Sequence, residues 1–327
     1  MRHLVLLFLL SACVGGSVAV PPPLFTKSSL AAHVAYLADD RLQGRAPGSA
    51  GDEMATDYIR DAFEDAGAEP LKELWFQSVS GVIHEKPFDS RNVMAVVRGT
   101  AQPDDYILYV AHHDGQGKCT ADASGDDICN GAVDNASGVA VLIELARRFA
   151  AEPPARSIIF LASAAEESGF QGTKAFIAAP PVTLANIRAV IGIDTLAARG
   201  YTRDVAILGE GLTNLRPLVK QAAARDARRV VRSPKAQGYY ERSDQIEFAR
   251  AGVPSLFVSG LFSPGPGEFT SGVYAQSRYH RPGDEAGAGI DYSGAAADAA
   301  TIYRLGRLIA YAEEAPRWTA RSPYQRP

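Results

Sequence analysis

Apolar residues along the chain follow two patterns, short continuous runs and longer segments with a helical repeat. The short runs are typical of buried strands, and we expect strands at residues 92–97, 106–111, 157–162, 189–193, 205–208 and 255–258. Helical spacing predicts helices at residues 27–39, 55–66, 137–150, 174–178, 214–227, 245–251 and 292–312. Strands that alternate with helices in this way are typical of a mostly parallel sheet covered on both faces.

No linker-like stretch interrupts this alternation, so we predict one α/β domain over residues 24–315. Its expected architecture is a three-layer αβα sandwich around a mostly parallel, mixed sheet. The 327 residues are 46% hydrophobic and 21% charged, which supplies enough apolar mass for one core. The tail over residues 316–327 carries Pro, Arg and Ser and is expected to be loosely held. The net charge of -4 gives no reason to expect a nucleic-acid partner.

The first 23 residues indicate a targeting segment that lies outside the fold. Leu4 to Leu10 are continuously apolar but too few to span a bilayer as a helix. The sequence Leu10-Ser11-Ala12-Cys13 resembles a bacterial lipobox, which would make Cys13 a lipid anchor. The alternative is ordinary cleavage after Ala19, and Pro21 to Pro23 would then tether the domain. Both interpretations export the protein, to the periplasm, to the outer membrane as a lipoprotein, or into the medium.

Two further cysteines, Cys119 and Cys129, lie in one loop rich in Gly and Asp. In an oxidising compartment such a pair is expected to form a disulfide. Two free thiols or a metal-binding pair are the alternatives. A zinc-binding pair normally has a shorter spacing and a second pair elsewhere, which this sequence lacks. The spacing therefore favours the disulfide.

Side chains of the metal-ligand type follow several predicted strands. His112, the pair Glu166-Glu167 and Asp194 each come directly or shortly after a strand-like run. In open α/β sheets, ligands bind beyond the carboxyl ends of the strands, so these residues are expected at one sheet edge. Each residue alone has a simpler explanation as a helix cap or a structural hydrogen-bonding group. Such separate explanations do not account for their joint placement.

Asp134 and His280 complete the candidate set. Asp134 lies on a tight turn just before an amphipathic helix, and His280 lies in a long loop that can fold back over the sheet edge. Imidazoles and carboxylates without a thiolate form a nitrogen and oxygen donor set, which suits two divalent ions and favours zinc. His113 is not expected to be a ligand, because its side chain should point away from that of His112.

Five segments of the chain occur in the order typical of one enzyme family. They are Val110-Ala111-His112-His113-Asp114, Asp134-Asn135-Ala136-Ser137-Gly138, Ala165-Glu166-Glu167-Ser168-Gly169, Asp194 and Tyr279-His280-Arg281-Pro282-Gly283-Asp284. These segments resemble the motifs of the co-catalytic zinc aminopeptidases of clan MH, whose relatives include glutamate carboxypeptidase and glutaminyl cyclase. The resemblance covers about residues 34–309 and includes segments outside the motifs, at residues 36–51 and 242–244.

The resemblance implies a zinc peptidase fold of the phosphorylase/hydrolase type and two Zn²⁺ ions, replaceable by Co²⁺ or Mn²⁺ in vitro. Asp134 would bridge the two ions. His112 and Asp194 would complete one ion, and Glu167 and His280 would complete the other.

The same resemblance implies roles for three residues that are not ligands. Glu166 would be the general base for a water activated between the two ions. Asp114 would orient His112, as imidazole ligands usually require. Tyr279 would donate a hydrogen bond to the oxyanion that forms in the reaction.

The leading interpretation is an exported zinc exopeptidase, an aminopeptidase acting on the N-terminal residues of peptide substrates. A carboxypeptidase or dipeptidase on the same metal centre is the first alternative. Glutaminyl cyclase is less favoured, because that chemistry uses one zinc and this chain retains the groups for two. A non-catalytic, receptor-like binding domain is the third alternative. Such domains lose ligands or the base, whereas all six positions are retained here.

Overall fold

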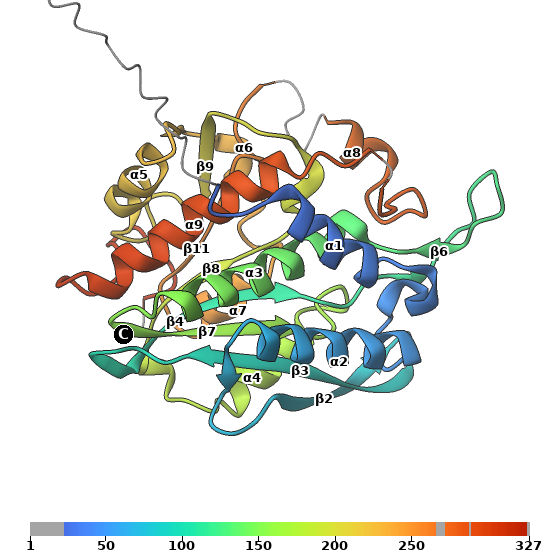
Figure 1. Ribbon diagram of the computed structural model, residues 1–327, viewed down its shortest axis with the longest axis horizontal. Helices are drawn as coiled ribbons and strands as arrows, with labels where there is room; N and C mark the ends of the chain where they lie inside the picture. Colours follow the sequence, from blue (N-terminus) through green and yellow to red (C-terminus); the bar gives the residue numbers. More distant parts are fainter. Residues whose placement is uncertain (1–22, 266–271, 288, 326–327) are drawn as a thin grey trace, which may run out of the picture.

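A mixed sheet of nine strands forms the centre of the molecule, with helices on both faces (Figure 1). The computed structural model describes residues 23–265, 272–287 and 289–325. The strand order is β1-β3-β7-β4-β8-β11-β9-β10, and β2 pairs with β3. The strands are β1 (Glu69–Pro70), β2 (Phe76–Ile83), β3 (Lys86–Val97), β4 (Gln102–His112), β7 (Arg156–Ser163), β8 (Ile187–Gly192), β9 (Asp204–Leu208), β10 (Arg229–Val230) and β11 (Ser255–Ser259).

The middle of the sheet is parallel and its flanks are largely antiparallel. Strand β4 pairs in parallel with β7 and β8, and β8 pairs in parallel with β11. Strand β3 is antiparallel to β7, β2 is antiparallel to β3, and β9 is antiparallel to β11. The predicted three-layer architecture around a mixed sheet is therefore confirmed, and the parallel pairing is concentrated in the middle of the sheet. The β2–β3 hairpin was not predicted, because its outer positions are polar and exposed on an edge strand.

Two apolar layers enclose the sheet, and the alternation of side chains along β4 supplies both. Ile107 and Tyr109 pack under α1, α2, α3 and α9, whereas Leu108 and Val110 face α4 and α7. Each large apolar side chain buried in this way contributes about 1.5–3 kcal/mol. The helices are α1 (Lys27–Leu37), α2 (Ala50–Asp65), α3 (Ser137–Ala151), α4 (Gln171–Ala178), α5 (Arg216–Ala224), α6 (Pro234–Gln237), α7 (Gln245–Arg250), α8 (Val273–Ser277) and α9 (Ser293–Tyr311).

Local capping sets several of these boundaries. Helix α2 begins after Ser49, whose hydroxyl accepts a hydrogen bond from the Asp52 amide, as an N-cap does. The turn after the helix contains Gly67 with a φ of 84°, a conformation that favours glycine. Helix α5 is shorter than predicted and starts with Pro217 in its first turn. Short helical turns cover η1 (Asp40–Arg45), η2 (Ala132–Ala136), η3 (Leu184–Asn186) and η4 (Leu196–Ala198).

The predicted cysteine pair is joined. Cys119 and Cys129 form a disulfide with an S–S distance of 2.08 Å. It closes the loop carried by the two-stranded ribbon of β5 (Gly117–Lys118) and β6 (Ile128–Cys129), which projects from the body of the domain (Figure 1). The disulfide prediction is therefore confirmed, and neither sulfur serves as a metal ligand.

The end of the chain differs from the prediction of a loosely held tail. The Trp318 indole donates a hydrogen bond to the Gly252 carbonyl, and the Tyr324 hydroxyl donates to Glu241. These two aromatic side chains are partly buried against the domain. The prediction of a loose tail rested on its Pro, Arg and Ser content and overlooked these two large apolar groups.

The targeting segment, with the candidate anchor Cys13, lies outside the described residues. Within the described part of the chain, no helix combines the length and apolar character needed to cross a membrane.

Candidate metal centre and active site

The carboxyl ends of three adjacent parallel strands gather the candidate ligands. His112 is the last residue of β4, Glu166 and Glu167 lie in the turn after β7, and Asp194 lies just beyond β8. Asp134 reaches the same edge from the η2 turn that leads into α3. The parallel pairing of β4 with β7 and β8 brings these strand ends together, which is the placement expected from the sequence.

Asp134 lies between the two imidazoles. Its Oδ1 is 3.3 Å from His112 Nε2, and its Oδ2 is 3.1 Å from His280 Nε2. The two oxygens of one carboxylate thus face two different histidines. This is the arrangement required of a ligand shared by two ions.

The remaining carboxylates divide between the two histidines. Asp194 Oδ1 lies 3.7 Å from His112 Nε2, and Glu167 Oε1 lies 3.2 Å from His280 Nε2. Two groups suited to a metal ion result: His112 with Glu166 and Asp194, and Asp134 with Glu167 and His280. In each group the candidate ligand atoms lie within 4.8 Å of one another.

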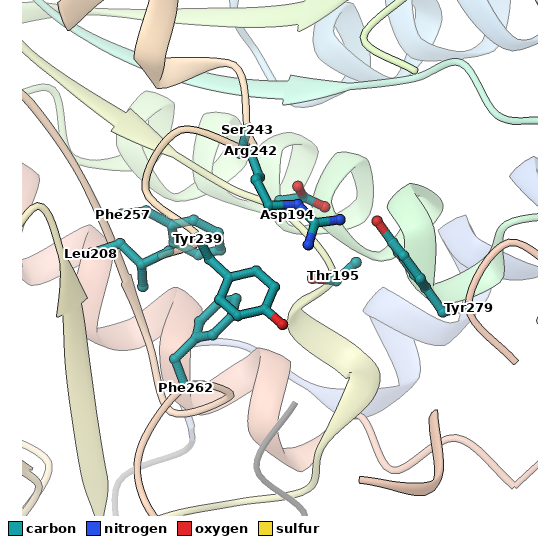
Figure 2. A pocket seen from close by; sticks show the side chains of 9 residues that line it. All are labelled: Asp194, Thr195, Leu208, Tyr239, Arg242, Ser243, Phe257, Phe262 and Tyr279. Carbon is teal, nitrogen blue, oxygen red and sulfur yellow. The ribbon is translucent and has the colours of Figure 1, made fainter. Parts of the chain in front are cut away.

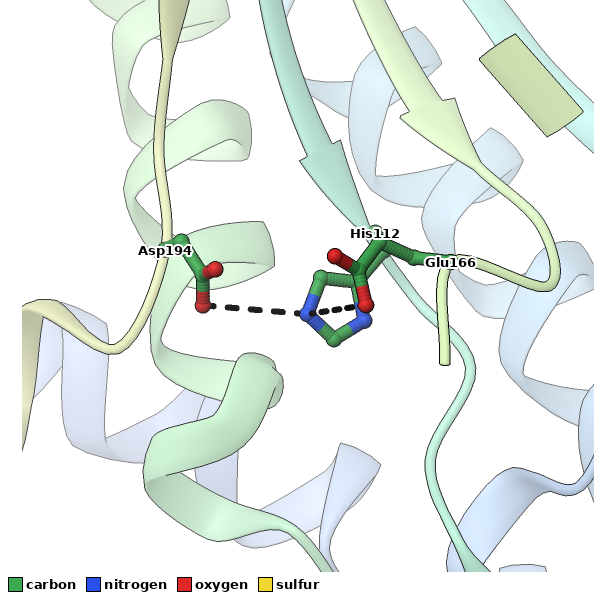
Figure 3. A group of neighbouring side chains, drawn as sticks. All are labelled: His112, Glu166 and Asp194. Atoms are coloured by element: carbon green, nitrogen blue, oxygen red, sulfur yellow. Dashed lines mark ion pairs between the residues drawn. The ribbon is translucent and has the colours of Figure 1, made fainter. Parts of the chain in front are cut away.

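Glu166 and Glu167 are neighbours in the chain but serve different groups. Glu166 Oε2 is 4.0 Å from His112 Nε2, beside Asp194 (Figure 3), whereas Glu167 faces His280. Burial raises the pKa of Glu166 well above its ordinary value, and the nearby carboxylates Asp244 and Asp194 raise it further against the opposing effect of His112. This environment therefore favours the protonated form of the Glu166 carboxyl.

The donor atoms of the site fit divalent cations. Among the described residues, Glu167 Oε1 and Asp194 Oδ1 are buried without a hydrogen-bond partner. In the described part of the chain, the carboxylates of this site form ion pairs with the imidazoles of His112 and His280 alone. These carboxylates belong to Asp134, Glu166, Glu167 and Asp194. Buried negative charge in such excess is costly unless cations balance it. The nitrogen and oxygen donors and their two-group arrangement suit zinc.

The pKa values of the two imidazoles also show that this site favours positive charge. Burial opposes a charged His112, but Glu166 and three aspartates around it raise its pKa well above its ordinary value. Burial also opposes a charged His280, and the close carboxylates of Asp134 and Glu167 raise its pKa to about 10. The sheet edge therefore attracts positive charge.

Asp114 holds the turn that carries the two glutamates. Its Oδ1 accepts a hydrogen bond from the Glu166 amide at 3.0 Å, and its Oδ2 accepts one from the Glu167 amide at 3.3 Å. His112 Nδ1 lies 3.2 Å from the Asp114 carbonyl oxygen but 3.7 Å from its carboxylate. Asp114 thus contacts the His112 imidazole chiefly through its backbone carbonyl oxygen, and its carboxylate also fixes the glutamate turn. That Asp114 orients His112 stays a prediction.

Asp284 does the same for the Asp134 turn. Its carboxylate accepts hydrogen bonds from the amides of Val133 at 3.0 Å and Asp134 at 3.1 Å, and from the Tyr274 hydroxyl at 3.0 Å. Sequence reasoning placed Asp284 in a motif without a role. Its signal was an acidic residue four positions after the ligand His280.

Asn135 joins the bridging turn to the strand end that carries Asp194. Its amide Nδ2 donates to the Ile193 carbonyl at 3.0 Å, and its Oδ1 accepts from the Thr195 amide at 3.1 Å. Gly131 precedes the turn with a φ of 58°, and a Cβ there would collide with the Asp134 carbonyl oxygen. The backbone around Asp134 is therefore fixed from both sides.

Arg45 is a second residue that sequence reasoning missed. Its side chain is buried, and its guanidinium donates to four backbone carbonyls. These belong to Leu37 (2.6 Å), His113 (2.8 Å), Asn130 (2.6 Å) and Gly131 (3.1 Å). Arg45 thus connects the loop after His112 with the loop before Asp134.

His113 points away from the metal centre, as strand alternation predicts. Its Nδ1 lies 3.4 Å from Asp52 Oδ1, and its Nε2 lies 3.1 Å from the Arg91 carbonyl oxygen. It belongs to neither metal group.

A pocket opens beside the metal centre (Figure 2). Its cavity volume is about 20 Å³, or about 320 Å³ when the open space between its lining side chains is counted, and Tyr279 and Asp194 stand at its metal side. Burial raises the pKa of the Tyr279 hydroxyl above its ordinary value, so it stays protonated and can donate a hydrogen bond. The Tyr279 ring stacks on His280 at 3.9 Å. The other lining residues are Thr195, Leu208, Tyr239, Arg242, Ser243, Phe257 and Phe262.

Curated proteins share part of this chain. A probable zinc metalloprotease of Pyrenophora teres f. teres is 39% identical over 108 residues, which cover 33% of this chain and 23% of that protein. Aminopeptidase NAALADL1 of Rattus norvegicus is 35% identical over 94 residues, covering 27% of this chain and 11% of that protein. The matched region thus spans less than a quarter of either relative.

Solved structures share the fold across most of the chain. A leucine aminopeptidase precursor from Bacteroides thetaiotaomicron superposes with a TM-score of 0.64 at 18% identity, covering 87% of this chain and 98% of that one. Glutaminyl cyclase from Porphyromonas gingivalis gives a TM-score of 0.66 at 20% identity, with the same coverage. At these identities the likeness establishes the fold alone.

A family model decides the relationship. The model of peptidase family M28 matches residues 92–305, well over half of the chain and the whole span from β3 to α9 that holds the candidate ligands. This match confirms the resemblance to zinc peptidases inferred from the ordered motifs. The chain belongs to peptidase family M28.

Proposed function

We propose that the protein is an exported, zinc-dependent aminopeptidase that removes N-terminal residues from peptides. The observation that carries this proposal is the pair of metal groups joined by Asp134 beside a largely apolar pocket. The names of two relatives, a zinc metalloprotease and an aminopeptidase, support the same chemistry.

His112, Asp194 and one oxygen of Asp134 would hold one zinc ion. The other oxygen of Asp134, with Glu167 and His280, would hold the second. Two zinc ions, when bound, lower the pKa of a shared water and polarise the scissile carbonyl. The hydrogen bonds from the Glu166, Glu167, Val133 and Asp134 amides to Asp114 and Asp284 keep the donor side chains in place before any ion arrives.

Glu166 is the proton carrier in this proposal. It takes a proton from the attacking water while the water oxygen bonds to the carbonyl carbon. When the C–N bond breaks, Glu166 passes that proton to the leaving amine. The position of Glu166 beside the His112 group, with Oε2 4.0 Å from His112 Nε2, suits both steps.

Tyr279 and the pocket would position the substrate. The protonated Tyr279 hydroxyl donates a hydrogen bond to the oxyanion as the carbonyl carbon becomes tetrahedral. The side chain of the N-terminal residue enters the pocket against Leu208, Phe257 and Phe262, which favours apolar residues. The free α-amine of the substrate is cationic and is attracted to the carboxylate-rich edge.

A dipeptidase or carboxypeptidase is the second candidate. Arg242 lines the pocket, and its guanidinium could bind the terminal carboxylate of a short substrate. A glutaminyl cyclase is less favoured, because the ligands form two metal groups.

A substrate panel tests the proposal. Leucine, phenylalanine and alanine p-nitroanilides, their N-acetylated forms, dipeptides and N-blocked peptides are assayed before and after chelation, together with the zinc content. We expect hydrolysis of substrates with a free amine, loss of activity on chelation, recovery with Zn²⁺ or Co²⁺, and two ions per chain. Release of C-terminal residues from blocked peptides would identify a carboxypeptidase. Absence of turnover in a zinc-loaded protein would leave a binding domain.

Export is tested on the mature N-terminus. The apolar run before Cys13 and the Cys119–Cys129 disulfide support it. Mass spectrometry of the membrane and soluble fractions should find either a lipidated Cys13 or an N-terminus at Val20. An intact Met1 in cytoplasmic protein would refute export.

A further inference from the structure

The C-terminal tail, residues 316–325, is attached to the domain by backbone and side-chain hydrogen bonds. The Trp318 indole N–H donates to the Gly252 carbonyl at 3.0 Å. The Thr319 amide donates to the Leu212 carbonyl at 2.8 Å. The tail therefore has a defined course over the turns that follow β9 and precede β11.

Tyr324 continues this attachment onto the segment after α6. Its ring centroid lies 6.0 Å from that of Tyr240 and 5.6 Å from that of Trp318. Its hydroxyl donates a hydrogen bond to Glu241 Oε1 at 2.8 Å. The tail thus contacts two consecutive residues, Tyr240 through an aromatic contact and the exposed Glu241 through a charge-assisted hydrogen bond.

Tyr240 is held tightly on its inner side. Its hydroxyl lies 3.1 Å from the Ser255 carbonyl oxygen, and its own carbonyl accepts from Gln245 Nε2 at 2.7 Å. A Cβ added to Gly209 would lie only 2.6 Å from the Tyr240 ring. The ring is therefore packed between the domain and the tail.

The residues on either side of the Tyr240–Glu241 pair line the pocket. Tyr239 and Arg242 form one wall, with the Arg242 guanidinium 5.1 Å from the Tyr239 ring centroid (Figure 2). The Tyr239 ring lies 5.3 Å from that of Phe262 on the next wall. Tyr239 is bonded to Tyr240, and Arg242 is bonded to Glu241. A shift of the Tyr240–Glu241 pair must therefore move both wall residues.

We propose that the C-terminal tail is a positioning element for the Tyr239–Arg242 wall, and that it thereby sets which N-terminal side chains the enzyme accepts. This inference rests on the proposed aminopeptidase function. The tail contacts described above involve none of the five metal ligands. It therefore acts on the binding of large side chains and leaves metal loading unchanged.

Steady-state kinetics of tail variants test the proposal. In Tyr324→Ala and Trp318→Ala, KM for phenylalanine p-nitroanilide should rise about tenfold with kcat nearly constant, because the interaction lost is one of substrate binding. Alanine p-nitroanilide does not fill the pocket, so its kcat/KM should change by less than about twofold. Tyr324→Phe keeps the ring contact and should show a smaller effect.

Tyr311→Ala is the matched control, since Tyr311 is a 56% exposed aromatic residue on α9 outside the pocket. It should leave both substrates unaffected. Equal losses for the large and small substrates, or loss of zinc from Tyr324→Ala, would overturn the proposal. Either result would show that the tail supports the whole fold or the metal centre.

Hydrogen–deuterium exchange separates this inference from the proposed function. If the wild-type protein cleaves no aminoacyl substrate, the proposed function fails. Faster exchange over residues 238–243 in Tyr324→Ala, with the Tm nearly constant, would still show that the tail holds the wall. Unchanged exchange there refutes the positioning role regardless of activity.

Discussion

The metal edge and the pocket wall are built in different ways. Three candidate metal ligands, His112, Glu167 and Asp194, stand at or just after the ends of central parallel strands. Hydrogen bonds made by Asp114, Asp284 and Asn135 fix the turns at this edge. The wall at Tyr239 and Arg242 lies on a segment outside the sheet, and the end of the chain contacts the two residues between them, Tyr240 and Glu241. The sheet thus places the chemistry, whereas peripheral segments shape the space for the substrate.

This difference predicts two classes of effect. Changes at the metal edge should remove activity or metal for every substrate, because the same groups act in each turnover. Changes at the wall should alter the ranking of substrates.

The largest effect is expected at the two neighbouring glutamates. Glu166→Gln should keep its zinc and lose about 10²–10⁴-fold in kcat, because the general base is gone. Glu167→Gln should lose zinc from the His280 side. Metal analysis together with kcat measures both. If the two variants behave alike, the division between base and ligand is wrong.

Arg45 should affect stability strongly. Arg45→Met leaves several buried carbonyls without a donor, at about 1–3 kcal/mol for each unsatisfied group. We expect the free energy of unfolding of the zinc-free protein to fall by about 3 kcal/mol or more in urea titrations. Arg45→Lys retains the charge but not the planar fork, and should recover part of this loss. A zinc-free Arg45→Met protein as stable as the wild type would contradict the connecting role.

Cys129→Ser opens the loop that projects beside the metal edge. Its disulfide closes about ten residues, so the expected loss of stability is about 2–3 kcal/mol. Thermal unfolding under non-reducing conditions measures this loss. The zinc content of Cys129→Ser should stay at the wild-type level. A loss of zinc from this variant would instead indicate that the cysteine sulfurs are metal ligands.

The smallest effect is expected from a substitution of Asp105, which lies at the opposite, amino-terminal edge of the parallel strands. A hydrogen bond from Arg188 at 2.7 Å is the main cause that lowers the pKa of Asp105. A carboxyl with a lowered pKa stabilises the fold above its unfolded pKa, and this stability is lost as the pH falls through its folded pKa. The contribution should be below about 1 kcal/mol, because the pair is partly exposed. Asp105→Asn should flatten the acid side of the pH–stability curve without changing kcat/KM.

Local patterns in the sequence were sufficient for the central strands and for the grouping of the candidate ligands. Apolar runs marked the central strands, and a strand end followed by His112, Glu166 or Asp194 predicted a shared edge. The Gly/Asp-rich loop with two cysteines predicted the disulfide. These features are visible because each depends on residues close together in the chain and on the general rule for carboxyl ends of parallel strands.

Tertiary structure alone decided what supports and surrounds that edge. Asp284 reaches the Asp134 turn from 150 positions away, and Arg45 joins loops 68 and 85 positions distant. The pocket walls come from separate segments. The tail that contacts Tyr240 and Glu241, next to one wall, has the composition typical of a loosely held end. Contacts between residues so far apart leave no periodic or local signal, because they depend on where the packed layers bring the chain together.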